Sequence, residues 1–318
     1  MKKPIAVTVV ILMLAFTATG CAAQTVSTSN MPEQPAVQTE TPTPSQTPTP
    51  SPTPTQEPTL SPSPPPSPPT PIVIKFKDRI VEKVIRTILN QPKGSITDQD
   101  MLKVWNFKFN YEELEAYGGR IKTLDDLRWC VNLRRVILFD TKIKDISALS
   151  GTRDLVEFQC QDKLKDFTPL LANKKLSTIG LVGATDDFFR KLMENCDQLN
   201  VVSLHKSKIS SESLRMLAEK YKLSDLSLAS CGITDISPVA GLTGLQYLSL
   251  ERNKIKDISP LAKNPQLSRY IDLSANKITD WSPLENMTAL RFLSVRANPV
   301  TESPALDKLE KNGCKIYR

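Results

Sequence analysis

The chain has 318 residues, of which 40% are apolar, enough for one large or two modest folded domains. Its formal net charge is +7 at pH 7, and Lys and Asp alternate along the C-terminal part with no long run of one sign. Interspersed charges are typical of a solvated surface, so the sequence argues against a nucleic-acid partner.

The N-terminus has the composition of an export signal. Two lysines precede an apolar run over 5–16, which is too short to span a membrane as an ordinary helix. The run is followed by the letters ATGC, ending at Cys21, and this ending resembles the lipobox of bacterial lipoproteins. The resemblance implies that 1–21 is a signal peptide and that Cys21 is lipidated on the extracellular face of the cell membrane. Cleavage by an ordinary signal peptidase is the alternative.

Residues 22–71 are rich in Pro, Thr and Ser, and 16 of the 25 prolines fall between Pro32 and Pro71. Such a segment cannot bury enough apolar surface to offset its ordering entropy. Repeated proline favours extended polyproline II at about 3.1 Å per residue. The composition therefore predicts a disordered tether.

A small helical cap is expected over 72–103. Ile72 to Phe76 alternates like a short strand, and Asp78 can cap a helix that runs to about Leu89. Thr97 can cap a second short helix. Because the ends of stacked repeats expose apolar surface, we interpret this segment as their N-terminal cap.

The pattern LxxLxLxxN recurs from Val104 to Val300, every 21 to 24 residues after a longer first interval. Its fourth and sixth positions are apolar in every unit, as in Leu226 and Leu228. Because side chains alternate along a strand, two unbroken apolar columns can be buried only if the units stack in parallel. The units resemble leucine-rich repeats, most closely those of the 22-residue internalin type. The predicted fold is an α/β solenoid with a concave parallel β-sheet, a convex side of 3₁₀ turns and short helices, and a C-terminal cap over 301–318.

Several details follow from the alignment. True helices are expected at Asp186 to Glu194 and Ser210 to Lys220, and about seven extra residues interrupt the first unit within 110–120. The resemblance implies that the ninth-position asparagines bond backbone groups of neighbouring turns: Asn253, Asn276 and Asn298.

A row of aspartates precedes the convex turns: Asp145, Asp166, Asp235, Asp257 and Asp280. A calcium ladder is one interpretation, but neighbouring Ser and Pro favour capping of the turns. The cysteines lack CxxC spacing. Cys130, Cys160 and Cys196 occupy apolar positions and Cys231 replaces a ladder asparagine, which predicts buried thiols. We expect no metal and no cofactor.

The one histidine, His205, lies on an outward strand position two residues from Ser203, with Asp225 expected on the next strand. This permits a Ser/His/Asp arrangement. However, an exposed strand supplies neither an oxyanion hole nor a pocket that excludes water. We therefore expect no enzyme, with a hydrolase as the less favoured alternative.

The outward third position carries aromatic residues that the repeat does not require. Tyr247, Tyr270 and Phe292 should lie on adjacent strands about 4.8 Å apart. Charged residues flank them: Glu251, Arg252, Asp272 and Arg296. A smaller N-terminal patch is also predicted from Arg135, Ile137 and Phe139. Aromatic residues with Arg among them are typical of protein-binding hot spots. The same rings could stack on sugars or pack against the C-terminal cap.

By resemblance to internalin-like adhesins, the sequence indicates a non-catalytic extracellular protein-binding module, tethered to the membrane, that grips its ligand on the concave sheet. Binding of a glycan or cell-wall polymer is the main alternative, and a scaffold without a dedicated ligand is another. The identity of the partner and the oligomeric state stay open.

Overall fold

The computed structural model describes residues 70–318, which lie in one compact unit, Ser67–Arg318. The predicted signal peptide, Cys21 and all but the last two residues of the predicted tether lie outside the described residues. Within 70–318, the helices are all too short or too polar to cross a bilayer.

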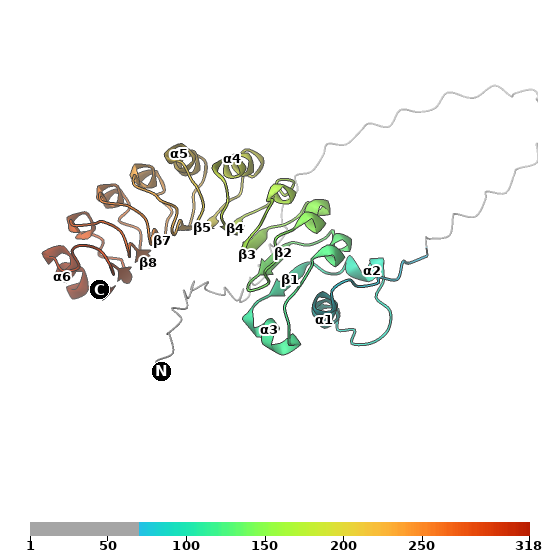
Figure 1. Ribbon diagram of the computed structural model, residues 1–318. Helices are drawn as coiled ribbons and strands as arrows, with labels where there is room; N and C mark the ends of the chain where they lie inside the picture. Colours follow the sequence, from blue (N-terminus) through green and yellow to red (C-terminus); the bar gives the residue numbers. More distant parts are fainter. Residues whose placement is uncertain (1–69) are drawn as a thin grey trace, which may run out of the picture. The chain divides into compact units, whose positions relative to one another are not determined.

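Ten parallel strands form one sheet in the order of the chain. They run along the inner side of the arc in Figure 1. Their bounds are β1 Asn106–Phe109, β2 Arg135–Leu138, β3 Glu157–Lys163, β4 Thr178–Val182, β5 Val201–His205, β6 Asp225–Ser227, β7 Tyr247–Ser249, β8 Tyr270–Asp272, β9 Phe292–Ser294 and β10 Lys315–Tyr317. The predicted leucine-rich-repeat solenoid is confirmed.

The core contains the two apolar columns predicted from strand alternation, together with buried residues of the cap and of the convex side. Every fourth- and sixth-position side chain from Phe107 to Val295 is at most 2% exposed. Ile271 pairs in register with Leu248 and Leu293, so the extra residue of its unit lies before the strand. Successive units therefore bury each other's apolar faces, as the side-chain pattern requires.

The convex side carries 3₁₀ turns and two longer helices (Figure 1). The turns are η1 Asp125–Trp129, η2 Ser147–Gly151, η3 Thr168–Leu170, η4 Ser237–Gly241, η5 Ser259–Lys263 and η6 Ser282–Leu284, and the helices are α4 Asp186–Asn195 and α5 Ser211–Lys220. Both predicted helices are confirmed. The aspartate row caps the turns: Asp145, Asp166, Asp235, Asp257 and Asp280 each accept a bond of 2.7–2.9 Å from the N–H two residues later.

The N-terminal cap contains α1 Arg79–Ile88 and α2 Asp98–Met101, with Asp78 and Thr97 as their N-caps, as expected. The strand expected at Ile72 to Phe76 is wrong. Only Val73 forms a bridge, opposite Thr97. The ladder cannot extend because its partner segment turns into α2 directly after Thr97.

Two buried carboxylates fasten this cap to the repeats. Asp126 of the first unit accepts from the N–H groups of Lys77 and Asp78 at 3.0 Å. Asp78 accepts hydrogen bonds from the N–H groups of Ile80 and Val81 in α1 and from those of Lys122 and Thr123 in the first unit. Because the four donors come from two segments far apart in sequence, Asp78 fixes the position of α1 on the solenoid.

The extra residues of the first unit form a helix that the alignment did not predict, α3 Tyr111–Tyr117. Asn110 and Glu113 make a reciprocal capping box at its start, and Gly118, with φ of 67°, ends it in the left-handed region. At the other end of the chain, α6 Pro304–Lys311 packs on the last turn, and β10 adds the final strand to β9.

The asparagine ladder behaves as the resemblance implied. Asn253 accepts from the N–H groups of Cys231 and Ile233 and donates to the carbonyls of Leu228 and Leu250, all at 2.8–3.0 Å. Asn276 and Asn298 repeat the pattern one and two units later.

The residue before each ladder position is left-handed in seven units. These residues have φ between 50° and 74°: Asp140, Gly183, Lys206, Ser230, Arg252, Ala275 and Ala297. Six of them are not glycine and adopt this strained conformation at some cost in free energy. The chain therefore turns sharply at the same point of these units, where each strand leaves the concave face.

Candidate functional site

The strand register places three rows of side chains on the concave face of the C-terminal half. Asp225, Tyr247, Tyr270, Phe292 and Lys315 are consecutive partners in the first row. The second row holds Ser227, Ser249, Asp272, Ser294 and Tyr317. The third row continues past the strands through Glu251 and Arg296. Except for Arg252, which follows Glu251 at the left-handed turn, the sequence-predicted residues of this half therefore lie on three adjacent rows of one surface.

The centre of this surface is a stacked tyrosine pair. The ring centroids of Tyr247 and Tyr270 are 5.0 Å apart, and the planes differ by 10°. Both side chains are partly exposed on the sheet, while the next residue in the row, Phe292, is 40% exposed. Offset stacking at this separation contributes about 0.5–1.5 kcal/mol beyond area burial. The pair, here called the tyrosine platform, is therefore a stacked and partly exposed aromatic surface on the sheet.

A carboxylate lies at the hydroxyl end of one of the two rings. Tyr270 donates to Asp272 at 3.2 Å, and Asp272 also accepts from the N–H of Ser274 at 2.9 Å. Asp225 accepts from the hydroxyl of Ser224. Both Asp225 and Asp272 are thus bonded to neutral donors.

The pKa values of Tyr247, Tyr270 and Glu251 are consistent with a negative potential around the tyrosine pair. Burial, followed by the charges of Asp272, Asp225 and Glu251, raises the pKa of Tyr247 to about 12. The pKa of Tyr270 is raised by burial and then by Asp272. Burial also raises the pKa of the Glu251 carboxyl, followed by repulsion from Asp272, while Arg252 lowers it. Each shift has the sign expected for a group that is partly desolvated among like charges.

Cations lie at the edge of the platform. Arg252 pairs with Glu251 at 3.1 Å, with about half of its side chain exposed. Arg296 and Lys315 lie over the ring of Tyr317 in the terminal strand, at 5.3 Å and 5.2 Å from its centroid. Tyr317 holds these two cations at the end of the sheet. The surface is therefore negative beside the tyrosine pair and positive at the terminal strand.

The smaller N-terminal patch is organised around a different contact. Arg135 pairs with Glu157 on the next strand at 2.7 Å, and Phe139 is partly exposed. Ile137, predicted for the same patch, is only 6% exposed because the neighbouring side chains cover it. The structure adds Gln159, which is only 6% exposed and donates to Glu157 while its own carbonyl oxygen has no partner. The side-chain oxygen of Asn106 is likewise buried and unpaired. Sequence reasoning missed both amides, because nothing in a strand pattern marks an unpaired oxygen.

The register does not assemble the Ser/His/Asp arrangement. Asp225 lies beside Val201, whereas Ser203 lies beside Ser227. His205 is therefore four residues further along its strand than the partner of Asp225. Burial lowers the pKa of His205, followed by the charges of Lys206 and Arg252.

The cysteines of the described residues are free thiols, as predicted: Cys130, Cys160, Cys196 and Cys314 are buried and Cys231 is partly buried. Burial raises the pKa of Cys130 and of Cys160 to about 12. Within 70–318, no three His, Cys, Asp or Glu side chains are grouped closely enough to hold a metal ion.

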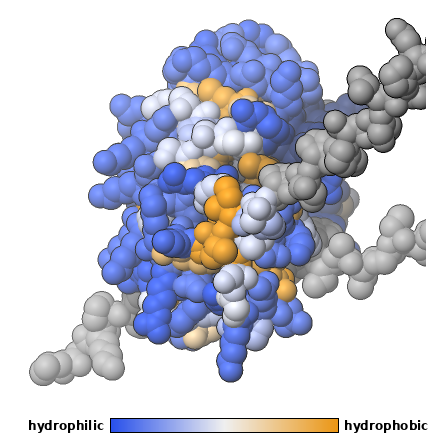
Figure 2. Space-filling view, turned by 90° about the vertical axis from the view of Figure 1, so that its right-hand side faces the viewer, coloured by the Kyte–Doolittle hydropathy of each residue, from blue (hydrophilic) through white to orange (hydrophobic). Residues whose placement is uncertain are grey.

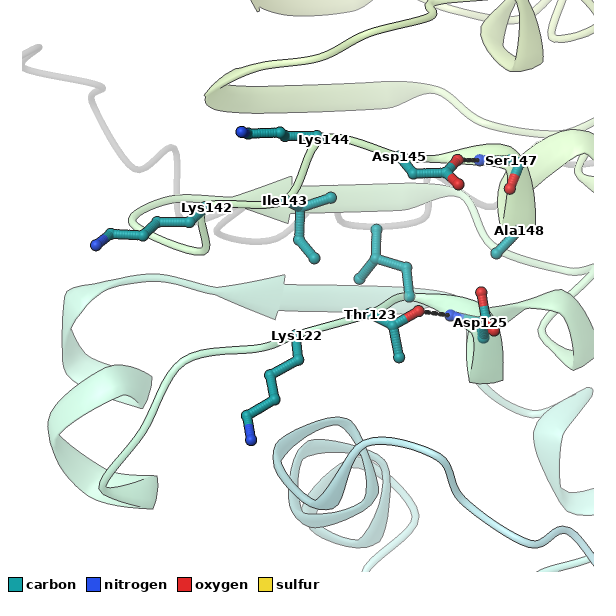
Figure 3. A pocket seen from close by; sticks show the side chains of 10 residues that line it. Lys122, Thr123, Asp125, Lys142, Ile143, Lys144, Asp145, Ser147 and Ala148 are labelled. Atoms are coloured by element: carbon teal, nitrogen blue, oxygen red, sulfur yellow. Dashed lines mark hydrogen bonds between the residues drawn. The ribbon is translucent and has the colours of Figure 1, made fainter.

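A shallow pocket of about 260 Å³ lies off the sheet, between residues 122–125 and 142–148. Figure 3 shows its lysine side chains extending away from Asp145, whose carboxylate accepts from the N–H of Ser147 at 2.7 Å. The carboxylate of Asp125 pairs with Lys77 at 2.8 Å. The polar groups of this pocket are engaged in local structure and do not converge on a common point.

Exposed apolar side chains gather at the capped end, which faces the viewer in Figure 2. Of the ten large ones on the described residues, nine lie between positions 72 and 156: Ile72, Val73, Ile88, Leu102, Trp105, Tyr111, Trp129, Val131 and Val156. The tenth is Phe292 on the concave sheet. The tyrosine platform is therefore distinct from the apolar surface of the cap.

Comparisons with known proteins agree with the repeat architecture. Residues 222–263 match the family model for leucine-rich repeats (2 copies), and no curated protein matches the chain. An internalin, InlF, of Listeria monocytogenes is similar in structure, with 24% identity, a TM-score of 0.60 and coverage of 76% of this chain and 75% of that one.

Two further solved structures match less closely. Internalin C2 of Listeria monocytogenes has 20% identity, a TM-score of 0.44 and coverage of 77% and 97% of the two chains. The Leptospira interrogans leucine-rich-repeat protein LIC12759 has 15% identity, a TM-score of 0.48 and coverage of 69% and 61%. The likeness to the Listeria internalin concerns the fold, while the tyrosine platform is argued from this chain's own residues.

Proposed function

We propose that this leucine-rich-repeat chain is a non-catalytic recognition module of the bacterial cell surface, which binds another protein on the concave face of its sheet. The observation that carries the proposal is the stacked, partly exposed pair of Tyr247 and Tyr270 with Phe292 beside it. The repeat pattern requires none of these rings, because the core is filled by the alternate, inward positions. Large aromatic residues on an accessible surface are enriched at the centres of protein interfaces.

The shape of the site favours a macromolecular partner. The rows lie on an open sheet surface, and the pocket elsewhere in the fold is shallow with its polar groups engaged locally. Small-molecule sites are usually concave cavities that enclose most of the ligand. An open sheet with a central aromatic cluster and charged groups around it has instead the layout of a protein-binding surface.

The test compares two triple variants of the full-length chain in pull-downs from bacterial and host-cell surface extracts. Tyr247→Ala, Tyr270→Ala, Phe292→Ala removes the concave rings, and Trp105→Ala, Tyr111→Ala, Trp129→Ala removes three exposed rings elsewhere. We expect the first variant alone to lose the proteins captured by wild type. Equal capture by wild type and the concave variant, with both folded by circular dichroism, would rule out the proposal. Sugar arrays in parallel test the glycan alternative.

The membrane tether is part of the same proposal and rests on the sequence ending at Cys21. Two or three acyl chains at this residue would hold the module firmly at the membrane, whereas one chain would bind only reversibly. Metabolic labelling with a fatty-acid analogue should tag wild type and not Cys21→Ser. Equal labelling of both would contradict lipidation at this residue.

A further inference from the structure

Negatively charged side chains lie beside the tyrosine pair on the concave face, and this charge determines which chemical group can bind there. The three carboxylates of Asp225, Glu251 and Asp272 all raise the pKa of Tyr247 through their charge. Asp225 and Asp272 lie next to the stacked rings in the strand register, one in the same row and one in the adjacent row. The rings therefore lie in a local negative field, although the whole chain has a formal charge of +7.

We propose that the tyrosine platform receives a cationic side chain, a lysine or an arginine on an exposed segment of the partner protein. A cation gains from the electron-rich ring faces and from the carboxylates together. It would also remove the repulsion between Glu251 and Asp272 that helps to raise the pKa of Glu251. An anionic group at the same place would meet the carboxylates of Asp225 and Asp272, which are bonded to neutral donors, at a cost in free energy. This inference rests on the proposed function and names the chemistry of its partner.

The geometry favours an organic cation over a metal ion. Within the described residues, no three acidic side chains are grouped closely enough to coordinate a metal. Calcium needs six to eight oxygen ligands at 2.3–2.6 Å. An ammonium or guanidinium group is larger and can contact one carboxylate and one ring at the same time. The spread of the carboxylates around two rings therefore suits a lysine or an arginine side chain.

The charges along the second row and at the end of the sheet determine where the guest should lie. Ser227 and Ser249 are consecutive partners beside the tyrosines, and Asp272 follows them in the same row. At the far end of the sheet, Arg296 and Lys315 lie over Tyr317 and would repel a second cation. The basic residue of the partner should therefore dock over β6 to β8, with the less basic part of its segment toward β9.

The direct test uses defined peptides and the full-length chain in detergent. A fluorescein-labelled decapeptide of alternating Gly and Lys is compared by anisotropy with its lysine-acetylated form and with a Gly-Glu decapeptide. We expect the lysine peptide to bind at least about tenfold more tightly than either comparator. Equal binding of the three peptides, or no binding of the lysine peptide, overturns the inference.

Matched variants localise the binding. Asp225→Asn, Asp272→Asn should weaken the lysine peptide about tenfold, whereas Asp187→Asn, Asp197→Asn, which removes two well-exposed carboxylates of the convex side, should leave it unchanged. Equal weakening by both pairs would show diffuse attraction and overturn the inference. If the first pair fails to fold, the ring signals of labelled Tyr247 and Tyr270 in wild type decide: they must shift when the peptide is added.

The outcome is separable from that of the proposed function. Suppose the concave aromatic variant no longer captures the surface protein, while the wild-type chain does not bind the lysine peptide. The recognition module then stands and the cationic guest is wrong. Suppose instead that the lysine peptide binds through Asp225 and Asp272 while the aromatic variant still captures the surface protein. The cationic site then stands, and the concave rings are not where the protein partner binds.

Discussion

Replacing Asn253 with Ala should destabilise the solenoid more than any other single change in the asparagine ladder. The side chain is 7% exposed and makes four bonds of 2.8–3.0 Å to the backbone of two neighbouring turns. Each buried bond contributes about 1 kcal/mol net, so the loss should reach about 4 kcal/mol. Asn253 also follows Glu251 and the left-handed Arg252, so the same change loosens the edge of the tyrosine platform.

Equilibrium unfolding in urea, followed by circular dichroism, measures this loss. Asn298→Ala is the matched control, because Asn298 makes three such bonds and is half-buried near the end of the stack. Water can reach the backbone groups that Asn298→Ala leaves without a partner, so this variant should lose only about 1–2 kcal/mol of unfolding free energy. An Asn253→Ala loss below about 1 kcal/mol, at an unchanged urea slope, would refute the view that the ladder's buried bonds hold the turns.

Three further predictions follow from local geometry. Ala275→Gly should stabilise the fold by about 0.5–1 kcal/mol because φ is 53° there, whereas Ala305→Gly in α6 should destabilise it by a similar amount; urea unfolding that ranks them the other way would contradict this. Glu251→Gln should stabilise at pH 7 but not at pH 4. Because the pKa of Glu251 is raised in the folded protein, the folded protein binds more protons than the unfolded chain, and stability falls as pH rises through that pKa. An equal change in the free energy of unfolding at both pH values would contradict this prediction. Cys130 and Cys160 should react with a thiol reagent at pH 8 far more slowly than in urea, and similar rates in both conditions would show that these thiols are not buried.

Much of the architecture could be predicted from single residues. Leu226 and Leu248 had to face inward because a strand alternates its side chains, and a column without a polar member must be buried. The caps at Asp78 and Thr97 followed from short polar side chains just before apolar helical periodicity. The strand expected at Ile72 failed because alternation records local preference and not the length of the available partner.

Other features had a local signal that the repeat alignment obscured. Asn110 and Glu113 form a capping box that marks the start of α3, and Ser303 before Pro304 marks the start of α6. By contrast, the left-handed turns at Arg252 and Ala275 had no signal, because neither residue is glycine. Their conformation is imposed by the ladder bonds that follow, not by their own preference.

The candidate site divides in the same way. The sequence by itself determined that Tyr247, Tyr270 and Phe292 share one outward row, since a period of two fixes which face each residue occupies. Only the tertiary structure decided that the first two rings stack and that the hydroxyl of Tyr270 donates to Asp272. Rotamers and the distances between units depend on packing across strands more than 20 residues apart. Local sequence therefore determines which face of the sheet each side chain occupies, but it does not determine which residues of other units the side chain contacts.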